Sequence, residues 1–250
     1  MGASGHILSF AEYAAIRHPT PYLVEVERDG SHLSLLGGLH SSDPADPMFG
    51  RIDAAFSRLS PMFALHEGTP PAVEPDREIA VRRHGEAGLV RHLAARAGIG
   101  TASMDIPLAE EAGLLRRKVG QGAALVFLVV RQLASFNRKT ARMDYGAYFR
   151  EFFDTIAPEL HLAGIDWPLI EAEHVRLLGR PLVPVHVTGL ETNPMCDDLP
   201  TQRIARWSNR RRDEYMLRRL LEALREHRRV FAIVGVTHAV MLEPALRAGV

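Results

Sequence analysis

Two histidines stand in the same short context near opposite ends of the chain. One apolar run leads into Gly37 with His40 three residues later, and a second leads into Gly235 with His238 three residues later. Each run has the length of a buried strand, and in open α/β sheets ligands bind outside the carboxyl ends of the strands. If the two strands are neighbours, His40 and His238 meet at one site. Gly37 and Gly235 leave room there for a substrate or an ion.

Glu67 is the third candidate, because it also directly follows a short apolar run. Two imidazoles and a carboxylate can hold a divalent ion such as manganese, iron or zinc and leave positions for water. The same trio also suits hydrolysis without a metal, with a histidine or Glu67 as the general base. Haem is the alternative cofactor, since histidines at strand ends suit its axial ligation.

Arg212 is the fourth candidate, on a predicted helix over residues 201–228. It precedes Met216 and Leu220 at intervals of four, so it lies along or beside the apolar face of that helix. An inward guanidinium needs a carboxylate, a phosphate or a ligand to compensate its charge. Arg212 is therefore expected to stabilise a developing oxyanion or hold a substrate carboxylate, unless it forms a structural ion pair.

Strand-like and helix-like patterns alternate along the chain, which predicts an α/β fold. We expect a single layered domain over residues 1–250, with a central mixed β-sheet flanked by helices and the site at the carboxyl ends of the core strands. The predicted strands cover residues 22–27, 32–36, 61–65 and 230–234. Residues 100–106 fit a short strand or an extended segment, and residues 182–187 fit an edge strand because Pro184 cannot donate to a neighbour. The predicted helices cover residues 49–59, 86–97, 145–156, 169–178 and 201–228, with one long or two abutting helices over residues 108–137 and a short final helix.

The composition of the chain excludes several classes of binding partner and site. The 250 residues carry a formal net charge of zero, which argues against a nucleic-acid partner. Cys196 is the single cysteine, so disulfides and cysteine-based zinc sites are excluded. The sequence has no run of 18 apolar residues and no secretory signal, so we expect a cytoplasmic protein without a membrane partner. The apolar segment 123–130 and the aromatic segment 145–156 can line either a substrate cavity or the face of a homodimer.

Residues 21–40 resemble the opening of the TraB/PrgY/GumN/Tiki group, which is related more distantly to erythromycin-esterase and ChaN-like proteins. Residues 212–216 and 235–238 resemble its paired Arg-Asn/Asp-x-x-Met and Gly-x-x-His motifs. Glu67 falls where the group places an acidic residue, and Asp105 lies near where many members carry another glutamate. The match covers both ends of the chain and hardly touches residues 121–201.

The resemblance implies a hydrolase-like α/β fold with the two histidines, the glutamate and the arginine in one pocket. Tiki-type members are regarded as metal-dependent proteases, erythromycin-esterase members open lactones with histidine and glutamate, and ChaN members bind haem iron. Asp105 also fits the N-cap of a helix after Pro107.

The leading hypothesis is a metal-assisted hydrolase of an ester, lactone or amide/peptide bond in a small-molecule or peptide substrate. The alternative is a non-catalytic haem-, iron- or peptide-binding protein that uses the same crevice.

Overall fold

The computed structural model describes residues 6–68, 72–138 and 145–249. The chain divides into two compact units: Met1–Asp105 with Arg212–Val250, here called the sheet unit, and Ile106–Arg211, the helical unit. All of the predicted site residues belong to the sheet unit. The single domain over residues 1–250 stays a prediction.

The sheet unit contains one mixed sheet with the strand order β1-β2-β5-β3-β4. The strands are β1 Tyr22–Arg28, β2 Ser31–Gly38, β3 Phe63–His66, β4 Gly100–Ser103 and β5 Arg229–Gly235. β1 and β2 form the predicted antiparallel hairpin, whereas β2, β5, β3 and β4 run parallel to one another. Asp29 and Gly30 both take positive φ in the hairpin turn, the conformation that matches the twist of the flanking strands. The predicted mixed sheet flanked by helices is confirmed.

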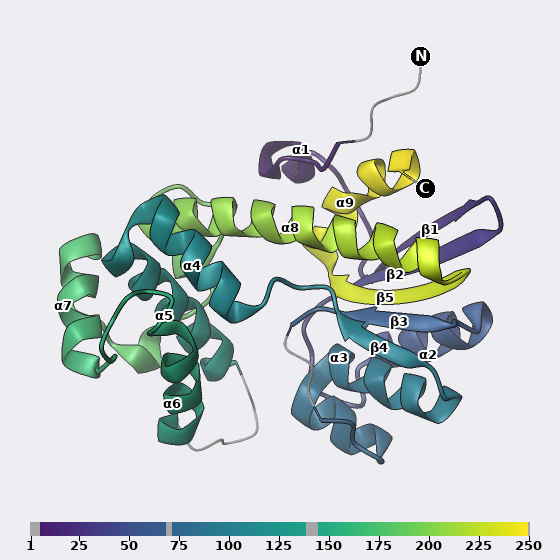
Figure 1. Cartoon of the computed structure of the whole chain (residues 1–250), viewed down its shortest axis with the longest axis horizontal. Helices are drawn as coiled ribbons and strands as arrows, with labels where there is room; N and C mark the ends of the chain where they lie inside the picture. The colour runs from purple at the N-terminus through teal and green to yellow at the C-terminus, as the bar shows by residue number, and fades with distance from the viewer. Residues whose placement is uncertain (1–5, 69–71, 139–144, 250) are drawn as a thin grey trace. The chain divides into compact units, whose positions relative to one another are not determined.

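Helices pack on both faces of this sheet (Figure 1). The bounds are α1 Phe10–Ala14, α2 Pro47–Leu59, α3 Arg77–Ala97, α8 Pro200–Glu226 and α9 Val236–Gly249. α1, α9 and the part of α8 after Arg211 share one hydrophobic core with the sheet, while α2 and α3 share another. β5 contributes to both cores, because Val230, Ala232 and Val234 alternate with side chains of the opposite face.

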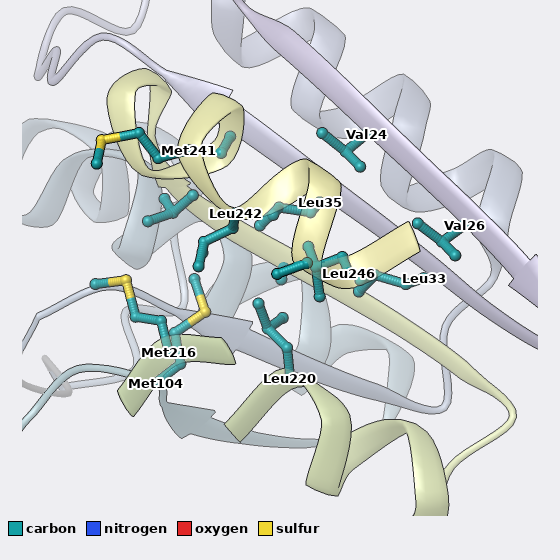
Figure 2. Close-up of a cluster of buried hydrophobic side chains, with 14 of the residues drawn as sticks. Val24, Val26, Leu33, Leu35, Met104, Met216, Leu220, Met241, Leu242 and Leu246 are labelled. Atoms are coloured by element: carbon teal, nitrogen blue, oxygen red, sulfur yellow. The ribbon is translucent and has the colours of Figure 1, made fainter. Parts of the chain in front are cut away.

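The core under α8 and α9 fixes the helix that carries the predicted arginine. Met216 and Leu220 of α8 point toward Leu242 and Leu246 of α9, with strand residues such as Leu35 alongside (Figure 2). These side chains are almost fully buried, and each buried leucine contributes about 1.5–3 kcal/mol of transfer free energy. Met216 and Leu220, which follow Arg212 at intervals of four, therefore anchor α8 in this core just after Arg212.

α3 begins earlier than the sequence predicts. It starts at Arg77, with Asp76 as its N-cap, and contains a kink at Gly85, where φ is 58° and ψ is −139°. A Cβ on Gly85 would lie 2.8 Å from the carbonyl oxygen of Ser41, so glycine is needed there. The helical period is interrupted at the kink, which is why the pattern predicted only the segment from Glu86 onward.

The helical unit holds α4 Leu108–Val119, α5 Gln121–Asn137, α6 Tyr145–Ile156, α7 Trp167–Leu178 and the part of α8 up to Arg211. The apolar centre of α5 is buried in its core. Glu111 is also buried and is bonded by Arg131 and Ser208. None of the helices in the described ranges has both the length and the apolar character needed to cross a membrane.

The predicted strand over residues 182–187 is wrong. This segment contains a 3₁₀ helix, Pro184–His186, and is followed by a second one, Leu190–Thr192. Pro184 lies in the first turn, where its missing N–H is not needed and its fixed φ suits a helical start. Leu182 and Val187 are buried against the helical core, whereas Val183 and Val185 between them are exposed.

Candidate functional site

The two Gly-x-x-His motifs lie at the same edge of the sheet. β2 and β5 are parallel neighbours in which Gly38 pairs with Gly235, so both motifs leave the sheet at its carboxyl end. His40 follows β2 on an exposed segment, and His238 lies in the first turn of α9 and is buried. The strand neighbourhood assumed from the sequence is therefore present.

Glu67 and both histidines surround Gly235. The position that a Cβ would take on Gly235 lies 3.4 Å from Oε2 of Glu67, 3.5 Å from Nε2 of His40 and 3.7 Å from Cδ2 of His238. The structure thus brings together three of the predicted site residues, contributed by the ends of three strands. The missing side chain of Gly235 leaves open the point on which they converge.

Glu67 is held at both oxygens of its carboxylate. It directly follows β3, and its backbone N–H donates to the carbonyl of Ile233, which continues the pairing with β5. Oε2 accepts the backbone N–H of Gly235 at 2.7 Å, and Oε1 accepts a guanidinium N–H of Arg212 at 2.7 Å. Burial raises the pKa of Glu67, but the charges of Arg212 and the histidines and the Gly235 N–H lower it well below its ordinary range. Glu67 is therefore a carboxylate at neutral pH.

Arg212 joins Glu67 to Asp105. Its side chain is 14% exposed, and its Nε and one terminal nitrogen donate to Asp105 at 2.8 and 2.6 Å. The predicted N-cap role of Asp105 is wrong, since α4 has Pro107 at its N-cap and no side-chain cap bond. Two carboxylates thus compensate the inward guanidinium, as the sequence led us to expect.

His238 is oriented by Asp213, which the sequence analysis did not assign to the site. Nδ1 of His238 lies 2.5 Å from Oδ1 of Asp213, whose side chain is 0% exposed. Nε2 lies 3.9 Å from Oε1 of Glu67. Burial lowers the pKa of His238, but the charges of Asp213 and Glu67 and the hydrogen bond from Nδ1 raise it above its ordinary value. A signal for Asp213 was present, because an aspartate three and seven residues before Met216 and Leu220 lies on the buried face.

Gly37 serves packing in this structure. A Cβ on Gly37 would lie 2.6 Å from Cβ of Ala239 and 2.9 Å from Cα of Val236. The glycine therefore lets the start of α9 approach β2, and its contact with a ligand stays a prediction.

The metal site also stays a prediction. Within residues 6–68, 72–138 and 145–249, no group of three or more histidine, cysteine, aspartate or glutamate side chains is arranged to hold a metal ion. Both oxygens of the Glu67 carboxylate accept hydrogen bonds, from Arg212 and from the backbone of Gly235. His66, the last residue of β3, is buried, and its Nδ1 lies 3.3 Å from the carbonyl oxygen of Glu67.

No protein-family model, curated protein or solved structure matches the chain.

Replacing Gly235 by alanine is expected to separate folding from ligand binding. The new Cβ would be at ordinary van der Waals distances from its neighbours, so the melting temperature should stay within a few degrees of the parent. It would fill the point on which Glu67, His40 and His238 converge, and a displaced reacting group should lower kcat/KM about tenfold or more. Gly50→Ala in α2 is the control, because a Cβ there meets open space. Full activity of Gly235→Ala would show that this space is not used.

Proposed function

We propose that the chain is a hydrolase that cleaves an ester, lactone or amide/peptide bond in a small-molecule or peptide substrate. The observation that carries the proposal is the buried pair of Asp213 and His238, whose Nε2 faces Glu67 next to Arg212. An imidazole fixed at Nδ1 by a carboxylate is suited to exchange a proton at Nε2. The resemblance to the TraB/Tiki group and to the erythromycin-esterase proteins supports the same chemistry.

His238 is the general base in this proposal. Nε2 removes a proton from a water molecule while the water oxygen forms a bond to the substrate carbonyl carbon, and the carbonyl π electrons move to the oxygen. The tetrahedral intermediate then expels the alcohol or amine, which takes the proton back from His238. Asp213 stabilises the imidazolium between these steps, and the raised pKa makes the neutral imidazole a stronger base.

Arg212 and Glu67 supply the charges beside this base. The guanidinium is held by Glu67 and Asp105, so its orientation is fixed before a substrate binds. A fixed cation in a site shielded from water stabilises the negative charge that develops on the carbonyl oxygen. Glu67 in turn attracts the protonated form of His238.

A divalent ion is the alternative to His238 as the base, because an ion bound at Nε2 would take the lone pair that removes the proton. His40, His238 and Glu67 would hold it, because they surround the open point at Gly235. Asp105 and Asp213 add two further carboxylates beside the guanidinium of Arg212, so an added cation improves the charge balance. When bound, such an ion supplies Lewis-acid polarisation of the carbonyl and acidifies water.

A hydrolysis screen tests the proposal. The parent and the His40→Ala/His238→Ala double variant, purified without chelators, would be assayed against aryl esters, lactones and fluorogenic peptides. We expect one class to be cleaved by the parent and none by the double variant. Elemental analysis of the same samples should find a divalent metal in the parent that the double variant lacks. A parent that cleaves nothing and has a haem absorption band would favour the binding function instead.

A further inference from the structure

We propose that Glu86 is a positioning residue for His40, holding the exposed histidine with its Nε2 toward the site as Asp213 holds the buried one. The orientation of His40 by Glu86 is argued from the contacts of α3. The expected effect of Glu86 on kcat rests in addition on the proposed function.

Glu86 reaches the segment that carries His40. Its Oε1 accepts the backbone N–H of Ser41 at 3.1 Å, and its Oε2 lies 3.7 Å from Nδ1 of His40. The glutamate side chain is 12% exposed and the histidine side chain 61%. A carboxylate thus stands behind Nδ1 of His40, on the side of the ring away from the convergence point at Gly235.

The kink in α3 places Glu86 there. Gly85 approaches the carbonyl oxygen of Ser41 so closely that a Cβ would lie 2.8 Å from it. Ser41 therefore contacts α3 at two points, through its N–H at Glu86 and through its carbonyl oxygen at Gly85. The residue after His40 is fixed to the helix, and the direction in which His40 leaves β2 is fixed with it.

The two motif histidines have matching surroundings. Each has Nδ1 facing a carboxylate from a helix, which is Asp213 of α8 for His238 and Glu86 of α3 for His40. The two helices belong to the cores on opposite faces of the sheet. Nε2 of His40 and the ring of His238 both approach Gly235. Each layer of helices thus contributes one carboxylate that orients one histidine.

The carboxylate of Glu86 also affects the tautomer of His40, which a purely structural role of Glu86 would not do. A negative charge facing Nδ1 favours the neutral tautomer with the proton on Nδ1, which leaves the lone pair on Nε2. Without the carboxylate this preference is lost, and the Nε2–H tautomer that is common in water gains population. Residues that orient metal-bound histidines typically contribute 10- to 100-fold to metal affinity or activity, and an effect of about that size is expected for Glu86.

The test combines nitrogen NMR of the imidazole with steady-state kinetics. In ¹⁵N-histidine-labelled protein at alkaline pH, His40, assigned with His40→Asn, should be in the Nδ1–H form in the parent and shift to the Nε2–H form in Glu86→Ala. On the substrate found by the screen, Glu86→Ala should lower kcat about 10-fold or more with little change in KM. Glu86→Gln should recover part of the loss, because its amide oxygen still accepts the Ser41 N–H. Glu78→Ala, an exposed position in the first turn of α3, is the control.

An unchanged tautomer of His40 in folded Glu86→Ala, or in Glu86→Gln if the alanine variant does not fold, would overturn the proposal. If the parent is active on a substrate, an unchanged kcat of the same variant on that substrate would also overturn the proposal. The NMR result needs no substrate, so a parent that cleaves nothing contradicts the proposed function while the tautomer still decides the role of Glu86.

Discussion

Replacing His238 by asparagine is expected to lower kcat/KM about 10²- to 10⁴-fold while the protein still folds. The amide nitrogen of asparagine takes nearly the position of Nδ1, so it can still donate to the buried Asp213. The ring nitrogen Nε2 is lost, and with it the group that exchanges the proton. Alanine is a poorer choice, since it would leave a buried carboxylate without a donor.

The measurement is kcat/KM on the substrate found by the screen, beside circular dichroism and thermal unfolding. His186→Asn is the matched control, because His186 is exposed and lies in the helical unit. If His238→Asn is folded and keeps activity within about threefold of the parent, His238 is not the base. A loss of activity that follows a loss of folding would leave Asp213→Asn as the variant that decides the role of the pair.

Replacing Arg212 by methionine is expected to destabilise the protein by about 3–5 kcal/mol and to abolish hydrolysis. Methionine keeps much of the length of the side chain but removes the guanidinium, so Glu67 and Asp105 lose the cation they share. Two partly buried carboxylates then face each other, and burial of an unpaired charge is among the most costly of single changes. Urea unfolding of the variant measures the change directly.

The pH dependence of stability distinguishes this cause from lost packing. In the parent the pKa of Glu67 is lowered from its ordinary value of 4.5, so its contribution to stability is present above that pH and is lost as the pH falls. In Arg212→Met the buried carboxylate of Glu67 loses this cation and favours protonation, so the difference in stability from the parent should shrink in acid. Arg225→Met, at an exposed position near the end of α8, is the control. A destabilisation of Arg212→Met that does not change with pH would contradict the ion-pair explanation.

Local patterns in the sequence predict most of the sheet unit. The hairpin turn at Asp29 and Gly30, the apolar runs before Gly37 and Gly235, and the short strand before Glu67 each carry their own signal. Strand order carries no such local signal, because pairing of β2 with β5 joins segments nearly 200 residues apart in sequence. The repeated Gly-x-x-His motif suggested that these strands are neighbours, since chemistry at strand ends needs them together.

The residues that orient the histidines were harder to predict. Asp213 stands beside Arg212, and no motif assigns it a role, although its spacing from Met216 marks a buried position. Glu86 follows a kink that depends on contact between Gly85 and Ser41, and no local periodicity encodes such a contact. The apolar run around Pro184 predicted a strand, but a short apolar run does not by itself distinguish a strand from an irregular segment, and its two buried residues, Leu182 and Val187, pack on a helical core.

The measurement that tests the central claim most directly is a double-mutant cycle on the two motif histidines. The parent, His40→Asn, His238→Asn and the double variant would be compared in kcat/KM on one substrate under one set of conditions. If both histidines act as a unit at one site, the double variant should lose no more than the more damaged single variant. Losses that multiply in the double variant, or a His40→Asn variant as active as the parent, would contradict a single site built from both motifs.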